Sequence, residues 1–304
     1  MKNMTFRLIS FLFLLPFLTF AQDSAEIKHS LFIAGHDFTG IIGEEGEVIW
    51  QAEKAHARDG YVLKNGNILI CYANEVIEYN KKNKIVFNYE RAEKSMELGT
   101  AVRLKNGNTL ITESGKNPRL LEVSKKGEIV KNVPLQPETD NTHMQTRMAR
   151  KLKNGNYLVP HLLAFKVKEY TPDGNVVDIF ETDMDDLGGR EAENWPFTAI
   201  RLKNGNTLTT LTHGNKVVEM DSEGKVVWEV NNENVEGSPF ADPCGAQRLP
   251  NGNTVIASYG AKKGIRLFEI DREKNIVWTM SNYNVHHFQI LTTNGKRVKG
   301  VPMK

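Results

Sequence analysis

The chain has 304 residues and a formal net charge of +2, from 39 basic and 37 acidic residues. A nearly neutral chain without a basic run gives no support for nucleic acid or an anionic membrane as a partner. The length could hold two average domains, but a repeat that runs along most of the chain favours one closed domain.

Residues 1–21 have the form of a secretory signal peptide, because two basic residues precede the apolar run Ile9–Phe20 and the small Ala21 follows. We expect cleavage after Ala21, which would leave 22–304 as a single domain and lower the formal charge from +2 to zero. The apolar run is too short for a membrane anchor, and no stop-transfer pattern follows it. The mature protein is therefore expected in the periplasm or secreted, as a monomer without membrane insertion.

The phrase Leu-Lys-Asn-Gly-Asn recurs along the chain and is clearest within Arg201–Leu208. An Asn-Gly pair between apolar runs predicts a tight hairpin, because such a turn needs positive φ, which Asn and Gly supply. Repeats spaced 41 to 50 residues apart and centred on a hairpin are typical of a β-propeller. The other copies lie at 63–67, 104–108, 152–156 and 249–253, with a degenerate sixth copy at Thr293–Gly295.

A second repeated phrase reads as strand, polar turn and strand, and its clearest copies are Glu219–Trp228 and Glu269–Trp278. Copies also lie at 78–87, 122–131 and 169–178, and Ile41–Trp50 precedes the first Asn-Gly-Asn. An aromatic ring at the same late position would pack the outer strand of one blade on the next blade. Four of the six copies have this ring: Trp50, Phe87, Trp228 and Trp278.

Each full repeat therefore predicts four strands, A to D from the axis outward. The Asn-Gly-Asn turn joins strand A to strand B, and the second phrase supplies strands C and D with the turn between them. In the fourth repeat the strands are Phe197–Leu202, Thr207–Leu211, Lys216–Met220 and Lys225–Val230.

The two ends of the chain are expected to share one blade, because the first C–D turn precedes the first A–B turn. Such a blade closes the ring and removes open sheet edges. The fold class predicted is all-β, a six-bladed β-propeller of four-stranded blades. The shared blade would combine Ser30–Ala34, Thr39–Ile42 and Glu47–Gln51 with Phe288–Leu291.

The two phrases resemble the repeats of quinoprotein (PQQ)-like propellers, and more closely those of the bacterial arylsulfotransferase propeller. The resemblance covers nearly all of residues 30–295. It implies a six-bladed periplasmic fold and, as one alternative, an enzyme with a funnel histidine as nucleophile, helped by further histidines and an arginine. Only the His-His-Phe-Gln-Ile-Leu stretch at 286–291 corresponds to a site. No bound quinone is implied, the cofactor is unknown, and a shared fold does not carry function.

The functional face is expected at the B–C and D–A connections, which vary in length, since binding residues concentrate on variable loops of a rigid scaffold. Seven of the eight histidines fall there, and only His29 does not. Clustered imidazoles can act as base, nucleophile or metal ligand, and the alternative is separate loop histidines bonded to the backbone. The catalytic candidates are His143, His286 and His287.

The start of each innermost strand differs from blade to blade, and such polar variety around an axis is typical of a ligand site. Two arginines would suit a carboxylate or sulfate. The alternative is a channel lined with polar groups for structural reasons alone. The ligand-binding candidates are His56, Arg58, Asp59, Glu97, Gln145, Arg147, His161, Trp195, His213 and Asp242.

No metal site is predicted, because no Cys/His pair has zinc spacing and the acidic stretch 181–193 matches no calcium loop. Cys71 and Cys244 lie in different repeats and are expected to be free, buried thiols. The function that we expect is an exported propeller that binds a small or oligomeric ligand in its central funnel, a glycan or aryl compound that can carry a negative charge. The alternatives are an arylsulfotransferase-like or lyase-like enzyme that uses a funnel histidine, and a scaffold for envelope proteins.

Overall fold

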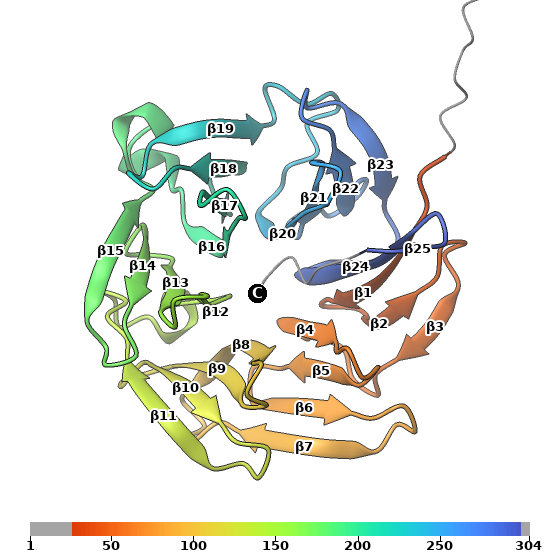
Figure 1. Ribbon diagram of the computed structural model, residues 1–304. Coiled ribbons are helices and arrows are strands. Elements are labelled where there is room, and N and C mark those ends of the chain that lie inside the picture. Colours follow the sequence, from red (N-terminus) through yellow and green to blue (C-terminus); the bar gives the residue numbers. More distant parts are fainter. Residues whose placement is uncertain (1–25, 299–304) are drawn as a thin grey trace, which may run out of the picture.

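Six antiparallel sheets surround a central axis in the computed structural model, which describes residues 26–298 (Figure 1). Five sheets have four strands, and the sixth has a fifth strand added. The prediction of an all-β, six-bladed propeller is confirmed. The predicted signal peptide, residues 1–21, lies outside the described residues. In the part of the chain that is described, no helix is long and apolar enough to cross a membrane.

Blades 1 to 5 follow one another along the chain, and the strands of each run from the axis outward. Blade 1 contains β4 (Asp59–Val62), β5 (Ile68–Cys71), β6 (Glu75–Tyr79) and β7 (Ile85–Glu90). Blade 2 contains β8 (Glu97–Arg103), β9 (Thr109–Ser114), β10 (Arg119–Val123) and β11 (Ile129–Pro134). Blade 3 contains β12 (Arg150–Lys151), β13 (Tyr157–His161), β14 (Lys166–Tyr170) and β15 (Val176–Glu181). Blade 4 contains β16 (Pro196–Arg201), β17 (Thr207–Leu211), β18 (Lys216–Met220) and β19 (Val226–Asn231). Blade 5 contains β20 (Pro243–Arg248), β21 (Thr254–Ser258), β22 (Leu267–Ile270) and β23 (Ile276–Met280).

Blade 6 joins the two ends of the chain, as predicted, and Figure 1 shows red and blue strands side by side in it. Strand β24 pairs antiparallel with β1, with Phe288 opposite Ile33. The degenerate Asn294-Gly295 turn does not lead into strand B, because the N-terminal β1 already occupies that place; it leads instead into the added inner strand β25. The sheet runs in the order β25 (Lys296–Arg297), β24 (His287–Thr293), β1 (His29–Ala34), β2 (Thr39–Ile42) and β3 (Val48–Gln51).

The Asn-Gly-Asn turns are hairpins, but only their glycine has positive φ. In the turn of blade 4, Gly205 has φ +93°, whereas Asn204 is not among the residues with positive φ. The Asn204 side chain accepts a hydrogen bond from the backbone N–H of Asn206 at 3.1 Å. The N–H of Leu202 donates to the carbonyl of Asn206 at 2.8 Å. The expected positive φ at asparagine is therefore wrong for the five full copies, because this longer turn uses asparagine as a side-chain acceptor. It is confirmed in the degenerate copy, where Asn294 has φ +48° and Gly295 has φ +73°.

A buried glutamate in each strand C of blades 1 to 5 joins the A–B turn to the next blade. In blade 4, Glu219 accepts hydrogen bonds from the side chains of Asn204 and Asn206, and Arg248 of blade 5 lies 3.1 Å from it. The guanidinium of Arg248 also lies over the ring of Trp228, 5.2 Å from its centroid. The repeated asparagines and aromatic rings therefore connect blades, as expected for the rings. The equivalent glutamates of the other blades are Glu78, Glu122, Glu169 and Glu269.

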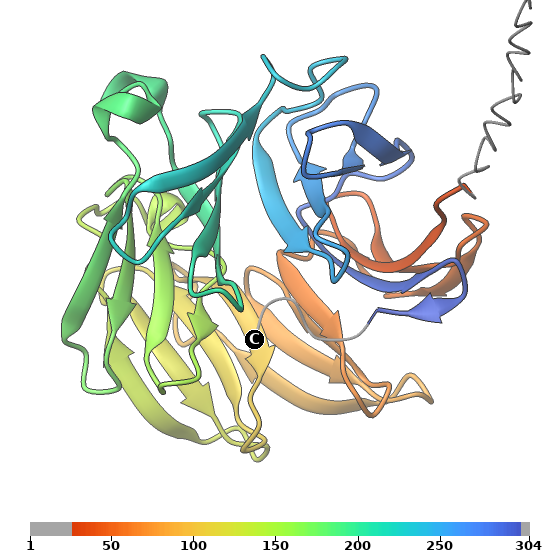
Figure 2. The same ribbon diagram turned by 45° about the horizontal axis from the view of Figure 1, so that its top comes forward.

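The propeller has two faces that differ in their connections. We call the face with the A–B and C–D turns the repeat face, and the face with the B–C and D–A connections the variable face. The D–A connections of the variable face contain three short 3₁₀ helices, and the second and third form the coil that projects from the ring in Figure 2. These are η1 (Thr142–Met144), η2 (Asp185–Leu187) and η3 (Arg190–Ala192).

Candidate functional site

The structure places seven of the eight histidines on the variable face, as predicted from the order of the strands. His29 starts β1 at the opposite end. His36 and His213 lie in B–C connections, His56, His143 and His286 lie in D–A connections, His161 ends β13, and His287 starts β24.

Six side chains from five blades come together around the axis beneath the variable face. They come from the starts of innermost strands or from the residues just before them and, for Tyr259, from the B–C connection that follows β21. The ring of His286 meets Phe197 edge-on at 4.9 Å and Tyr259 edge-on at 5.0 Å, between ring centroids. The guanidinium of Arg147 lies 5.8 Å from the centroid of Phe197. We call this group the axial layer: Arg58, Arg147, Phe197, Cys244, Tyr259 and His286.

His286 is held in one tautomer. Its Nδ1 lies 2.8 Å from the backbone carbonyl oxygen of Arg58, and because a carbonyl only accepts, Nδ1 carries the proton. The ring's Nε2 is then left with a lone pair and has no hydrogen bond among the described residues. Burial lowers the pKa of His286 to about 3, and the positive charges of Arg147 and Arg58 lower it further. His286 is therefore a neutral group at pH 7 that can accept a hydrogen bond but is a weak base.

Arg58, Glu97 and His143 form a chain of charges at the edge of the axial layer. The Glu97 carboxylate lies 2.7 Å from Nη1 of Arg58 and 3.0 Å from Nδ1 of His143. The hydrogen bond from His143 and the charge of Arg58 lower the pKa of Glu97 to about 2. His143 is 61% exposed, and only its Nδ1 is engaged within the described residues. Glu97 therefore stays ionised and orients an accessible imidazole.

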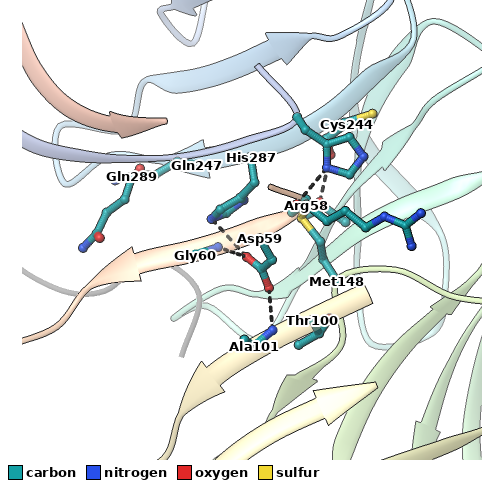
Figure 3. Close-up of polar contacts among 12 residues, drawn as sticks. Arg58, Asp59, Gly60, Thr100, Ala101, Met148, Cys244, Gln247, His287 and Gln289 are labelled. Atoms are coloured by element: carbon teal, nitrogen blue, oxygen red, sulfur yellow. Dashed lines mark hydrogen bonds and ion pairs between the residues drawn. The ribbon is translucent and has the colours of Figure 1, made fainter. Parts of the chain in front are cut away.

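Below the axial layer, Asp59, Arg150 and His287 fill the axis and are fully buried. Asp59 lies 3.3 Å from Nη1 of Arg150 and 3.4 Å from Nε2 of His287, and the backbone N–H of Ala101 donates to it at 3.2 Å. Figure 3 shows His287 and Ala101 directed at the two carboxylate oxygens of Asp59. Burial raises the pKa of Asp59 and lowers that of His287. The candidates Asp59 and His287 thus join four blades, and water does not reach them.

A separate group lies at the rim between blades 4 and 5. The ring of His213 stacks on Trp195 with centroids 4.6 Å apart. Glu193 lies 3.0 Å from one nitrogen of His213, and Asp242 lies 3.4 Å from the other. One face of Trp195 is therefore already covered by the protein's own histidine. On another side of the rim the exposed rings of His36 and His56 stack at 4.2 Å.

Two further candidates point into blade 3 and its neighbour and not toward the axis. Gln145 is 2% exposed, and its amide exchanges hydrogen bonds with the backbone of Gly115 at 2.8 and 2.9 Å. His161 is fully buried, and its Nε2 lies 2.8 Å from the hydroxyl of Tyr170. Burial lowers the pKa of His161 to about 3. The structure does not bring either side chain to the axial layer.

Three residues of the axial layer were not among the sequence candidates. Phe197 and Cys244 stand at the same place in the aligned repeat as Arg58, Arg147 and His286, so the alignment of the repeats could have indicated them. Tyr259 could have been found only as an aromatic residue that directly follows a strand B. Both cysteines are free and buried, as predicted, and burial raises the pKa of both thiols.

Metal-ligand clusters and surface grooves are two further places where a site could lie in the described residues. No three His, Cys, Asp or Glu side chains in residues 26–298 are grouped as metal ligands. A groove of about 540 Å³ lies on the repeat face between blades 1 and 2. Its walls belong to the Asn-Gly-Asn turns and to Glu78 and Arg103, which form the contact between these blades.

The comparisons with known proteins agree with this architecture. A family model described as Mal s 1 allergenic protein-like matches residues 18–251, and the chain belongs to this family. A comparison with curated proteins finds no match.

Similar solved structures include a protein of unknown function from Bacteroides caccae. It has 25% sequence identity and a TM-score of 0.75, and the match covers 86% of this chain and 98% of that chain. Virginiamycin B lyase from Staphylococcus aureus has 13% identity and a TM-score of 0.58, over 85% of this chain and 89% of its own. A catalytically inactive variant of that lyase with quinupristin, in which alanine replaces a histidine, has the same identity and TM-score over 86% of each chain. At 13% identity the likeness to the lyase shows the fold.

Proposed function

We propose that this protein binds a glycan or an aryl compound in its axial layer. The observation that carries the proposal is the position of His286, a neutral imidazole with a free acceptor nitrogen, between the edges of Phe197 and Tyr259. Apolar rings with a few convergent polar groups are the usual composition of a small-molecule site. Arg58 and Arg147 add charged donors at the same level.

Ligand-induced thermal stabilisation tests this proposal. We expect 4-nitrophenyl glycosides or substituted phenols from a broad panel to raise the melting temperature of the wild type. His286→Ala and Tyr259→Ala should each weaken the shift, because they remove the acceptor and one ring. His36→Ala is the matched control, since this exposed histidine lies on the same face outside the axial layer. A shift that persists in both axial variants would place the ligand elsewhere and refute the proposal.

The second candidate function is an enzyme, a lyase or an arylsulfotransferase-like transferase, and the Glu97–His143 pair favours it. A carboxylate that orients an accessible imidazole is a common arrangement for a general base or a nucleophile. Arg58 would neutralise the negative charge that develops in the substrate. In one structural neighbour the inactive variant has lost a histidine, which agrees with a role for an imidazole.

Activity on an aryl sulfate with a phenol acceptor, or on a uronate-bearing glycan, tests this second candidate. We expect His143→Ala to abolish turnover and Glu97→Gln to lower it strongly, with melting temperatures close to the wild type because His143 is largely exposed. Absence of turnover across the panel would argue against an enzyme. Copurification with an envelope protein, without any small-molecule shift, would support the scaffold alternative instead.

Export is part of the proposal and rests on the N-terminal sequence. Lys2, Arg7 and the apolar run Ile9–Phe20 support a signal peptide that is cleaved after Ala21. Expression in the source cell, followed by mass spectrometry of the purified protein, should give a chain that begins at Gln22. Recovery of the full-length chain from the cytoplasm would contradict export.

A further inference from the structure

Two arginines are almost completely buried near the axis, and they differ in their partners. Arg150 is 2% exposed and has the Asp59 carboxylate 3.3 Å from its Nη1. Arg147 is equally buried, and its Nη1 donates to the carbonyl oxygen of Thr146 at 2.8 Å. Within residues 26–298, no carboxylate lies within 4.0 Å of the Arg147 guanidinium. Arg147 is therefore a buried cation to which the described chain supplies no anion.

Such a residue is costly for the fold. Transfer of a guanidinium out of water is expensive unless a counter-ion or a full set of hydrogen bonds replaces the solvent. Burial and the charge of Arg58 lower the pKa of Arg147 to about 10, so the group is still protonated at pH 7. The charge of Glu97 acts on Arg147, but this carboxylate is already shared by Arg58 and His143.

The groups that surround Arg147 carry no negative charge at neutral pH. Burial raises the pKa of the Cys244 thiol and of the Tyr259 hydroxyl, which keeps both protonated. His286 is neutral because burial lowers its pKa. Since Arg58 and Glu97 neutralise each other, the axial layer has one uncompensated positive charge. Its complement is a ligand with one negative group.

We infer that Arg147 is the anion-recognition residue of the axial layer, and that the ligand carries a carboxylate or sulfate group next to an aromatic or other apolar part. The planar guanidinium pairs with such oxyanions through two parallel hydrogen bonds. Phe197, which lies under the guanidinium, and Tyr259 would contact the apolar part. This inference rests on the proposed function and names the class of its ligand.

Paired probes of equal size separate this inference from the proposed function. Binding of benzoate and benzamide, and of phenyl sulfate and benzenesulfonamide, is measured by calorimetry at constant ionic strength. We expect the anionic member of each pair to bind the wild type at least about tenfold more tightly than the neutral member. The reason is that loss of one partner of a buried charged contact weakens binding by at least that factor. Arg147→Gln should remove this preference, and Arg147→Lys should retain part of it. Arg266→Gln is the matched control, because this half-buried arginine also lacks a carboxylate partner in the described chain but lies outside the axial layer.

Stability without an organic ligand gives a second readout. Removal of an unpaired buried charge removes its desolvation cost. Removal of a paired buried charge leaves the partner charge buried and unpaired. Arg147→Met should therefore melt at or above the wild-type temperature in chloride buffer, and Arg150→Met should melt well below it. Sodium sulfate or acetate should stabilise the wild type saturably, beyond its effect on Arg147→Met.

Each outcome has one meaning. Equal binding of charged and neutral probes, unchanged by Arg147→Gln, would overturn the inference and leave the proposed function intact. If no aromatic probe binds, the proposed function fails for these ligands, and the saturable anion effect on melting decides the inference alone. A sulfate effect that is equal in Arg147→Met would overturn it.

Discussion

The Nε2 atom of His29 lies 2.6 Å from the carboxylate of Glu269, and both side chains are buried. In the four contacts between consecutive blades from 1 to 5, the corresponding glutamate meets an arginine or lysine from the innermost strand of the next blade, as Glu219 meets Arg248. Here the partner comes from β1, the second strand of blade 6. The N-terminal strand β1 therefore joins blade 6 to blade 5 through a histidine.

Loss of the His29–Glu269 contact should destabilise the fold more than loss of a half-exposed equivalent. His29→Ala leaves the buried Glu269 carboxylate without this hydrogen-bond partner, which typically costs about 1–3 kcal/mol and more for a charged group. Arg201→Ala removes a partner of Glu169 that is 25% exposed, and pairs nearer the surface contribute about 1 kcal/mol or less. Urea denaturation of both variants measures the difference. Equal losses of unfolding free energy in the two variants would show that the His29–Glu269 contact contributes no more than the Arg201–Glu169 contact.

The free energy of unfolding should depend on pH through His161. Burial lowers its pKa to about 3 in the folded state, whereas an unfolded histidine titrates near 6.5. Below pH 6.5 the unfolded chain binds a proton that the folded chain does not, so stability falls as pH decreases. The slope is up to about 1.4 kcal/mol per pH unit until the pH approaches 3, and it vanishes above 6.5.

His161→Gln removes this proton uptake and should lower the slope between pH 6.5 and 4.5 by the contribution of one histidine. The slope that remains comes from His286 and His287, whose pKa values burial also lowers. The pKa of Glu97 is lowered from its ordinary value of 4.5 to about 2. Its contribution to the free energy of unfolding is therefore lost only below about pH 4.5, outside this window. Urea titrations at four pH values measure the slope, with the exposed His36→Gln as control. Parallel curves for the wild type and His161→Gln would contradict the assignment.

Gly205→Ala should lower stability through backbone strain alone. Gly205 has φ +93°, and an added Cβ would meet no atom within 4 Å. The expected cost is about 1–2 kcal/mol, from the left-handed conformation. Gly205→Asn should cost less, because asparagine tolerates positive φ better than alanine does. Thermal or urea unfolding measures both, and no loss in Gly205→Ala would mean that the turn can change its conformation.

The two cysteines should be unreactive in the folded protein. Cys71 and Cys244 are free and buried, and burial raises the pKa of both thiols, which disfavours the reactive thiolate. A chromogenic thiol reagent should label neither in buffer and both in guanidinium chloride. Rapid labelling of Cys244 in buffer would show that the axial layer opens to solvent.

Much of the fold could be predicted because its signals are local. The predicted strands of blade 4 differ from the observed ones by one residue at most, since hairpin turns and alternating apolar residues lie within a few positions of each other. The closure by both ends also followed from the order of the turns. The error at asparagine was itself local: the dipeptide indicated the turn, but the hydrogen-bonding pattern decided which residue takes positive φ.

The site was less predictable, because it depends on which side chains meet across blades. Asp59 was a binding candidate, yet it pairs with Arg150, which lies 91 positions along the chain. Tyr259 joins the axial layer from a connection that showed no motif. Gln145, which follows η1, and His161, which ends β13, lie at the right level, but their side chains turn away from the axis.

The sequence by itself determined the number of blades, their strand order and the face on which the histidines gather, because turn chemistry and strand alternation act between near neighbours. Only the tertiary structure decided that Arg147 is buried without an acid while Arg150 has one. That difference arises where strands from different blades converge at the axis. The residues next to Arg147 and Arg150 in the sequence do not show which arginine an acid from another blade will meet.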